Sequence, residues 1–106
     1  RKHWLAFTTR TRGKLILDEG ASKAVVDRGR SLLPAGVVSH SGNFKRGDSV
    51  SCLDPKGREI ARGLCAYGAK DVGLIQGLPT REIERVLGFS NGDELIHRDN
   101  LVVLTP

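Results

Sequence analysis

One segment, residues 18–37, constrains the fold of this chain more than any other, because glycines and a proline divide it into short elements. Asp18 and Glu19 place negative charge at a helix start, where the helix dipole favours it. Apolar residues then follow helical spacing up to Gly29, which ends the helix as a left-handed cap. Residues 33–36 suit a type I turn, with proline second and glycine fourth. A helix, a turn and a strand are therefore predicted in close succession.

The rest of the chain repeats this pattern of short apolar runs between turn residues. Thr80 is expected to cap a late helix, and Gly63 inside a strand indicates a bulge or a close backbone approach. The order predicts a mainly β fold with short helices, of class α+β: a barrel-like sheet of about five to six mixed strands decorated by two to three helices. Strands are expected at 14–17, 37–40, 49–53, 59–67, 95–97 and 101–104, and helices at 18–29, 69–76 and 80–88.

The 106 residues correspond to one domain. Residues 1–13 are basic and are interpreted as a linker that settles onto the domain, with a short strand as an option, while residues 14–106 form the domain itself. Trp4, Leu5 and Phe7 are the anchors of that linker. The sequence has no Met and no secretory leader, so we expect a piece excised from a longer protein, with a processed mature protein as the alternative. No apolar run approaches the ~20 residues of a membrane span.

The net charge of +5 is concentrated in two places. Clustered positive charge attracts phosphate groups, so both places are candidates for contact with nucleic acid. The alternative is an ordinary solvated surface. Five basic residues precede the first acidic one, Asp18: Arg1, Lys2, Arg10, Arg12 and Lys14. Residues 28–62 carry a local charge of +4, from three acidic residues and the basic residues Arg28, Arg30, Lys45, Arg46, Lys56, Arg58 and Arg62.

Cys52 and Cys65 are predicted to be unpaired. A turn at 54–57 places Cys52 opposite Glu59, which is six residues along the strand from Cys65. At ~3.3 Å per residue the two cysteines are then about 20 Å apart, which is too far for a disulfide. Neither cysteine belongs to a CxxC pattern and the three histidines are scattered, so the closed zinc patterns are absent. We expect two buried free thiols in a reducing compartment, the cytoplasm.

No motif indicates a self-sufficient active site. There is no P-loop, and no GxGxxG follows a strand. The triplet His97-Arg98-Asp99 also occurs in the protein-kinase catalytic loop, but Leu104 stands where that loop requires Asn, so a turn before the last strand is the better interpretation. Asp18 and Glu19 are neighbours at a helix start, which favours capping over acid–base catalysis. We expect no catalytic, cofactor-binding or metal site.

Together these residues resemble the PUA module, which is named after pseudouridine synthases and archaeosine transglycosylases. The resemblance covers about residues 14–67 and implies a PUA-like pseudo-barrel. It rests on Asp18, Gly20-Ala21, Gly29, Leu33, Gly36-Val37, Phe44, Gly47-Asp48, Val50, Gly57, Ile60-Ala61 and Gly63.

A second resemblance spans nearly the whole chain, to the C-terminal part of the bacterial glutamate 5-kinase family. It implies a homo-oligomeric parent whose N-terminal amino-acid-kinase domain binds ATP, Mg²⁺ and L-glutamate and makes glutamyl 5-phosphate for proline biosynthesis. The piece in hand would lack that domain, its catalytic residues and its cofactors, and so be inactive. The motifs are Arg1-Lys2-His3-Trp4, Asp18-Glu19-Gly20-Ala21, Ser31-Leu32-Leu33-Pro34, Gly42-Asn43-Phe44-Lys45-Arg46-Gly47, Glu82-Ile83, Leu87-Gly88-Phe89 and His97-Arg98-Asp99.

PUA modules commonly bind RNA through a surface around the first helix, the following strand and the late strands. Carried over by position, that surface implies Gly20 and Ala21 at the start of the helix, and the stretch Gly29, Arg30, Ser31 and Leu33. To these we add candidate phosphate contacts of our own: Lys23, Arg28, Arg30, Lys45, Arg46 and Arg62. Phe44 and Tyr67 are candidate stacking platforms, but we expect both to pack in the core.

Three interpretations follow, in order of preference. The first is a non-catalytic accessory module that tunes a kinase domain or its assembly. The second is an RNA-binding module that contacts phosphates through a basic patch. The third, a self-contained enzyme, is nearly excluded by the absence of a catalytic motif.

Overall fold

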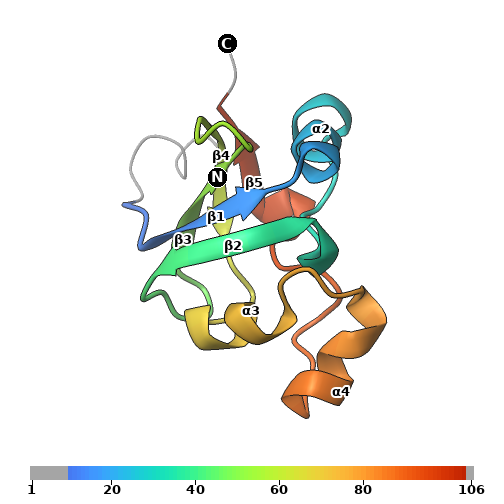
Figure 1. Ribbon diagram of the computed structural model, residues 1–106. Helices are drawn as coiled ribbons and strands as arrows, with labels where there is room; N and C mark the ends of the chain where they lie inside the picture. Colours follow the sequence, from blue (N-terminus) through green and yellow to red (C-terminus); the bar gives the residue numbers. More distant parts are fainter. Residues whose placement is uncertain (1–9, 105–106) are drawn as a thin grey trace.

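Residues 10–104 are described by a computed structural model, in which short helices flank one five-stranded mixed sheet (Figure 1). The strands are β1 (Gly13–Leu17), β2 (Val37–Gly42), β3 (Ser49–Leu53), β4 (Glu59–Leu64) and β5 (Leu101–Val103). Their order in the sheet is β2-β1-β3-β4-β5, with β1 and β3 parallel and all other neighbours antiparallel. The predicted α+β fold with a mixed sheet is confirmed. The anchors expected in the linker lie outside the described residues.

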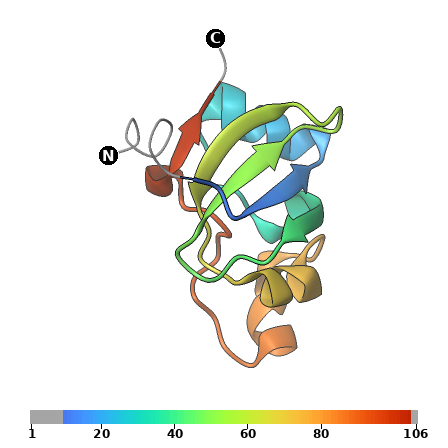
Figure 2. The same cartoon turned by 90° about the vertical axis from the view of Figure 1, so that its left-hand side faces the viewer.

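The helices gather at two places around this sheet. The α-helices are α2 (Glu19–Arg28), α3 (Ala69–Ile75) and α4 (Ile83–Leu87), and the 3₁₀ turns are η1 (Pro34–Gly36), η2 (Thr80–Glu82) and η3 (Arg98–Asn100). Helix α2 follows the carboxyl end of β1, while α3 and α4 lie together on the other side of β2 (Figures 1 and 2). Within residues 10–104, none of the helices has the length and apolarity that a membrane span requires.

Helix α2 begins and ends where the sequence predicts. Asp18 is its N-cap, and a side-chain oxygen of Asp18 accepts a hydrogen bond from the backbone N–H of Ala21 at 2.7 Å. Gly29 ends the helix in the left-handed region at φ 60°, and its N–H donates to the carbonyl of Ala24. Both caps satisfy backbone groups that a helix terminus leaves unpaired, so they fix the two ends.

The core lies between the sheet and the helices. Leu15 of β1 pairs with Cys52 of β3, and both side chains are fully buried. Cys52 and Cys65 are buried and unpaired, as predicted. Burial raises the pKa of Cys52 to about 12 and that of Cys65 to about 11, so neither is a reactive thiolate at neutral pH. Phe44 and Tyr67 are also core residues, which confirms that expectation.

The hairpin between β3 and β4 turns where expected, but its register differs from the prediction. The N–H of Gly57 donates to the carbonyl of Asp54 at 2.9 Å, which closes the turn at 54–57. A register shift between Cys52 and Leu53 then sets Leu53 opposite Glu59, so Cys52 faces Ala61 and not Glu59. An irregularity of one residue exchanges the facing partner without moving the turn.

Two predicted strands are wrong: one does not form and the other is shorter. Residues 95–97 do not form a strand; Ile96 makes a single antiparallel bridge to Leu32. The strand expected at 59–67 ends at Leu64. Gly63 of β4 packs closely against the segment before β5. A Cβ at that position would lie 2.6 Å from Cγ2 of Ile96 and 2.7 Å from the carbonyl oxygen of Asn100. The expected close backbone approach is confirmed.

Thr80 does not cap an α-helix. Its hydroxyl donates to the carbonyl of Asp93 at 3.2 Å, and residues 80–82 form a 3₁₀ turn before α4 begins at Ile83. The tertiary contact with the segment before β5 competes with capping for the same hydroxyl. Gly88 ends α4 in the left-handed region, as predicted.

Candidate functional site

A groove at the carboxyl end of α2 collects several of the predicted site residues. It encloses about 600 Å³. Arg28, Gly29, Arg30, Ser31 and Leu33 line one side, where the chain leaves α2. His97 and Arg98 line the other side together with Glu94. We call this the cationic groove.

Two segments far apart in sequence are held side by side to form this groove. The N–H of Leu32 donates to the carbonyl of Ile96 at 2.9 Å, and the N–H of Leu95 donates to the carbonyl of Leu32 at 2.8 Å. The hydroxyl of Ser31 accepts a hydrogen bond from the backbone N–H of Arg98 at 2.7 Å. The groove is therefore built on backbone hydrogen bonds and does not depend on long side chains for its shape.

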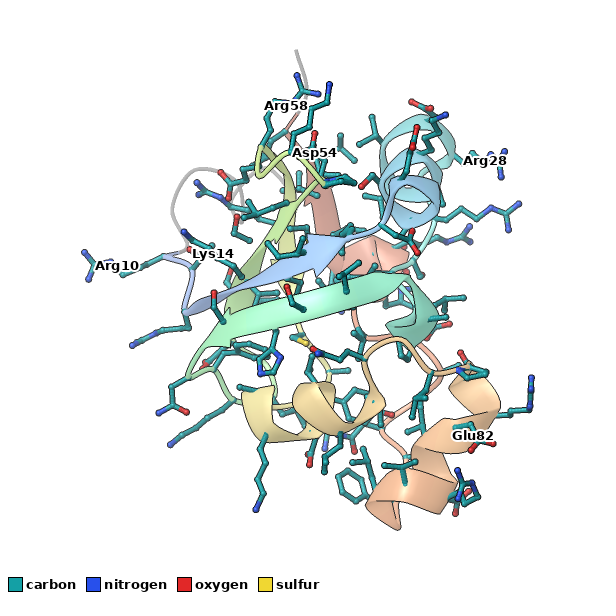
Figure 3. All side chains as sticks on the ribbon, in the orientation of Figure 1. Arg10, Lys14, Arg28, Asp54, Arg58 and Glu82 are labelled. Carbon is teal, nitrogen blue, oxygen red and sulfur yellow. The ribbon has the colours of Figure 1, made fainter. Side chains whose placement is uncertain are left out.

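The three arginines of the groove are not neutralised; Figure 3 labels one of them, Arg28, at the end of α2. Arg28, Arg30 and Arg98 form no ion pair with any residue in the described part of the chain. Glu94 is the one acidic residue that lines the groove within residues 10–104. Guanidinium groups left without a carboxylate partner are suited to bind phosphate or carboxylate groups of a ligand.

His97 has a defined proton arrangement when neutral. Its Nδ1 accepts a hydrogen bond from the backbone N–H of Asp99 at 3.0 Å, so the proton of the neutral ring is on Nε2. The carboxylate of Asp99 lies 3.5 Å from the same Nδ1 and can pair with the ring if it is protonated. The neutral ring therefore carries its donor on Nε2 and not on the nitrogen that faces Asp99.

A second cavity, of about 350 Å³, adjoins the cationic groove and shares Arg30, Ser31 and Leu33 with it. Small residues dominate its wall, including the predicted pair Gly20 and Ala21. At Gly36 a Cβ would lie only 2.4 Å from the Cβ of Ala21, so glycine is required for this close packing. The structure thus brings Gly20 and Ala21 beside the residues that follow α2.

Lys45 and Arg46 lie in the turn between β2 and β3. Arg46 lines a third cavity, of about 340 Å³, which shares Glu94 and His97 with the cationic groove. Lys45 does not line that cavity; its backbone N–H donates to the carboxylate of Asp48 at 2.9 Å and closes the turn. Arg46 is therefore near the groove, and Lys45 belongs to its surroundings.

Lys23 and Arg62 do not line the cationic groove. Lys23 pairs with Glu19 at 3.5 Å on a different face of α2. Nε of Arg62 donates to Oε2 of Glu59 at 2.8 Å, and Nη2 donates to Oε1 at 3.1 Å. This pair holds the pKa of Glu59 below its ordinary value and raises that of Arg62. Both bases already have a carboxylate partner, so the predicted set of phosphate contacts divides into two groups.

His97 and Arg98 were missing from the predicted site. The sequence marks them as a turn before the last strand and as one motif of the second family resemblance, and the 3₁₀ turn η3 agrees with the turn. Their place beside Ser31 arises from a pairing that spans more than sixty residues. Basic charge in a turn was the one physical signal for a binding role, and it is too common to select a site.

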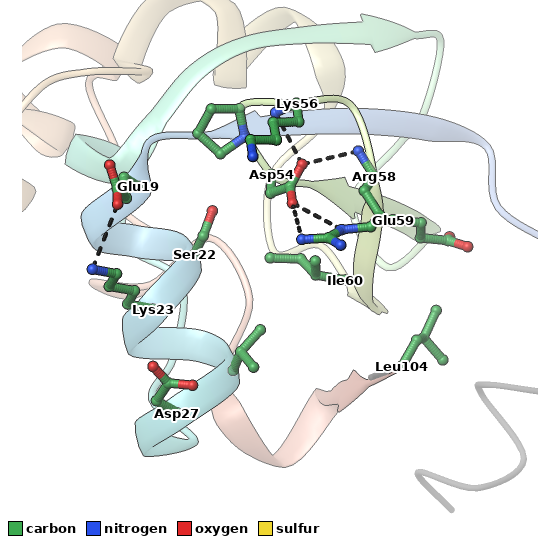
Figure 4. Close-up of a pocket in the computed structure, with 12 residues that line it drawn as sticks. Glu19, Ser22, Lys23, Asp27, Asp54, Lys56, Arg58, Glu59, Ile60 and Leu104 are labelled. Carbon is green, nitrogen blue, oxygen red and sulfur yellow. Dashed lines mark hydrogen bonds and ion pairs between the residues drawn. The ribbon is translucent and has the colours of Figure 1, made fainter. Parts of the chain in front are cut away.

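Residues 10–104 contain no group of three or more His, Cys, Asp or Glu side chains placed to hold a metal ion. A separate cavity of about 480 Å³ lies on the opposite side of α2, against the β3–β4 hairpin (Figure 4). Its lining has four acidic and three basic side chains, so it has no excess of positive charge, unlike the cationic groove.

The PUA domain family matches residues 13–87. The chain belongs to this family. The match includes β1 to β4 and helices α2 to α4, together with every predicted site residue. The cationic groove lies partly beyond it, because the PUA domain match ends before His97 and Arg98.

Two curated relatives extend the likeness of this PUA domain over nearly its whole sequence. It is 50% identical over 103 residues to the glutamate 5-kinase of Syntrophotalea carbinolica, which covers 97% of this chain and 28% of that enzyme. It is 53% identical over 104 residues to the glutamate 5-kinase of Nitrosomonas eutropha, with 98% and 28% covered. The chain therefore spans little more than a quarter of the length of these relatives.

A solved structure shares the fold. The PUA domain from Aeropyrum pernix K1, crystallised as a tartrate complex, superposes with a TM-score of 0.59 at 22% identity. The alignment covers 81% of this chain and 41% of that one. At this level of identity the likeness shows a common architecture.

Proposed function

We propose that this chain is the C-terminal PUA module of a glutamate 5-kinase. The observation that carries the proposal is an identity of at least 50% to such enzymes over almost the entire chain. The remaining part of the parent would supply an N-terminal amino-acid-kinase domain that binds ATP and Mg²⁺. That domain would transfer a phosphoryl group to the side-chain carboxylate of L-glutamate for proline biosynthesis, in a cytoplasmic homo-oligomer.

The module itself would act on the catalytic domain or on its assembly. Several groups in the described part that could react are already engaged in structural roles. Asp18 caps a helix, Asp54 closes a hairpin, and Glu59 is bound by Arg62. Burial keeps both thiols protonated. A regulatory or assembly role needs none of these groups to react.

Removal of the module from the parent tests this role. A parent that lacks residues 1–106 should still phosphorylate glutamate, but its inhibition by proline or its oligomeric state should change. The isolated chain should show no glutamate-dependent ATP consumption. Steady-state kinetics over a proline series and sedimentation of both forms provide the measurement. Unchanged proline response together with unchanged assembly would contradict the regulatory role.

RNA binding is the second candidate, favoured by the unpaired arginines of the cationic groove. The adjoining cavity of small residues lets a nucleotide approach the backbone closely. Phe44 and Tyr67 are 2% and 0% exposed, so these two rings cannot serve as stacking platforms. RNA would therefore be held through phosphates, with little reading of base sequence.

Titration with a mixed-sequence RNA at two salt concentrations tests the second candidate. Each phosphate contact to a single strand should contribute a slope of about −0.7 in log affinity against log salt. We expect binding at low salt that weakens steeply as salt rises. Absence of binding at low ionic strength would leave the regulatory role alone.

A further inference from the structure

The sheet has two faces, and the described helices pack on only one of them. Leu15 of β1, Cys52 of β3 and Ala61 of β4 lie side by side and are 0% exposed. They belong to one core together with buried residues of α2, α3 and α4. Successive residues of a strand point to opposite sides of a sheet, so the residues next to these three lie on the other face, which we call the outer face. Figure 2 shows the strands in front of α2, with the outer face toward the viewer.

Three apolar side chains lie on the outer face among polar ones. A row of register partners crosses this face from β1 to β5, made up of Lys14, Ser51, Arg62 and Val102. Ile16 and Leu53 form the adjacent row. Ile16, Leu53 and Val102 are each half-buried. Because α2, α3 and α4 pack on the opposite face, these three side chains offer an apolar surface to a further segment.

Two serines on the outer face are buried more deeply than its apolar residues. Ser49 is 3% exposed and Ser51 is 4% exposed. The hydroxyl of Ser51 donates to the carboxylate of Glu59. The hydroxyl oxygen of Ser49 is buried and has no hydrogen-bond partner in the described part of the chain. A buried hydroxyl without a partner is unfavourable, so we expect a segment that covers this face to supply a complementary group.

The chain enters the sheet beside these serines. The backbone N–H of Arg12 donates to the carbonyl of Ser49 at 2.7 Å. Nine residues precede Arg10, the first described residue. Fully extended, they would span ~30 Å. Three strand spacings, from β1 across β3 and β4 to β5, amount to ~15 Å. Residues 1–9 are therefore long enough to cross the outer face.

The composition of residues 1–9 suits a half-apolar surface with an unpaired hydroxyl. The segment contains Trp4, Leu5 and Phe7, and Trp4 is the single tryptophan of the chain. Large aromatic side chains bury much apolar area. An indole also carries an N–H donor, and a donor is a group that the hydroxyl oxygen of Ser49 can accept.

We propose that the outer face of the sheet is the docking surface for residues 1–9 of the same chain. The aromatic rings of this segment pack on Ile16, Leu53 and Val102, and the segment supplies a hydrogen-bond donor to the hydroxyl of Ser49. Docking at this face fixes the direction in which any preceding part of a longer chain leaves the sheet. The contact requires no activity of a parent enzyme.

Fluorescence of Trp4 in the 106-residue chain provides the first test, since a single tryptophan reports on this segment directly. We expect emission at a shorter wavelength than in the urea-unfolded chain, and quenching by acrylamide at least threefold slower. Both differences should be independent of protein concentration, because the contact lies within one molecule. Emission and quenching like those of the unfolded chain would overturn the proposal. Protection that appears only at high concentration would also overturn it, because the segment would then dock on a second copy.

A second test locates the contact. In the unsubstituted chain, nuclear Overhauser effects should join the indole protons of Trp4 to methyl groups of Ile16, Leu53 and Val102. Val102→Asp should at least double the rate at which acrylamide quenches Trp4. The matched control is Leu74→Asp on α3, where the side chain is 54% exposed, and it should leave that rate unchanged. Overhauser effects to a different surface, or equal effects of the two substitutions, would contradict docking on the outer face.

Ser49→Ala tests the proposed hydrogen bond. Because the segment would lose an acceptor for its donor, we expect acrylamide to quench Trp4 about twofold faster than in the original chain. A quenching rate that does not change would show that residues 1–9 do not bind this hydroxyl.

Discussion

The two sides of helix α2 carry similar charged side chains but leave them in different states. On the hairpin side, Lys23 and Arg58 are each paired with a carboxylate. On the other side, Arg28, Arg30 and Arg98 have no such partner within residues 10–104. The number of basic residues in a segment therefore does not identify an anion site. An anion site is identified by basic residues that have no carboxylate partner.

The difference arises from helical spacing and from the end of the helix. Glu19 and Lys23 are four residues apart on α2, so they meet on one face. Arg28 is in the last turn, where the helix dipole favours a cation, and Gly29 then redirects the chain. Arg30 consequently follows the new direction and lies with Arg28 in the cationic groove. A single left-handed residue thus separates the two charge environments.

The largest expected effect comes from Gly63→Ala, which crowds the segment that leads into the cationic groove. The added Cβ would lie 2.6 Å from Ile96 and 2.7 Å from the carbonyl of Asn100, so the segment that carries His97 must shift. We expect a loss of about 2–3 kcal/mol in the free energy of unfolding. Urea unfolding provides the measurement. Gly20→Ala is the control, because its Cβ would meet only Asp18 at an ordinary 3.5 Å. An unchanged free energy of unfolding in Gly63→Ala would show that β4 and the segment before β5 are not tightly packed.

The next effect concerns RNA affinity. Arg28→Gln, Arg30→Gln and Arg98→Gln combined should lower the affinity about tenfold to a hundredfold at low salt. The salt slope should become shallower by about 2 units, as expected for three lost phosphate contacts. The matched control, Lys23→Gln with Arg58→Gln, removes two paired charges and should change neither quantity. Equal losses in both variants would mean that the pairing of a charge does not matter.

Gly29→Val tests the residue that separates the two sides. A valine at φ 60° is strained, and no atom lies within 4 Å of the new Cβ, so the effect is one of backbone conformation. We expect a loss of about 1–2 kcal/mol. Gly29→Asn should cost less, because Asn tolerates the left-handed region. Thermal unfolding of both variants provides the measurement. A Gly29→Val variant as stable as the original chain would contradict the assignment of Gly29 as the helix cap.

The smallest effect is a pH dependence on the hairpin side. Hydrogen bonds from the backbone of Arg58 and Lys56, and the Arg58 side chain, hold the pKa of Asp54 below its ordinary value. A depressed pKa stabilises the fold above about pH 4, the ordinary value, and this contribution is lost as pH falls through the lower folded value. Asp54→Asn should therefore flatten the acid limb of the stability profile. An unchanged limb, measured by urea unfolding from pH 2 to 6, would contradict this role.

Local features were predictable from the sequence because their interactions close within a few residues. The cap at Asp18 reaches three residues ahead, and the turn at 54–57 closes between its first and last residues. Gly29 and Gly88 both end helices in the left-handed region, where glycine has no Cβ to clash. The same reasoning failed at Thr80, whose hydroxyl found a partner thirteen residues away.

The candidate site was predictable only in part. Arg28, Gly29, Arg30 and Ser31 are consecutive, so their common location follows from the chain itself. Arg98 joins them through a hydrogen bond to Ser31, across 67 positions. No local pattern specifies that contact, because it depends on the order of strands in the sheet.

The amino-acid sequence by itself determined where α2 begins and ends and where the 54–57 turn closes, since those choices depend on backbone preferences and on hydrogen bonds between near neighbours. Only the tertiary structure decided which basic side chains remain unpaired and which segments form one groove. The physical reason is that Leu32 and Ile96 meet only after the sheet has assembled and Gly63 has let the chain pass closely. Charge availability is therefore a property of the packed molecule.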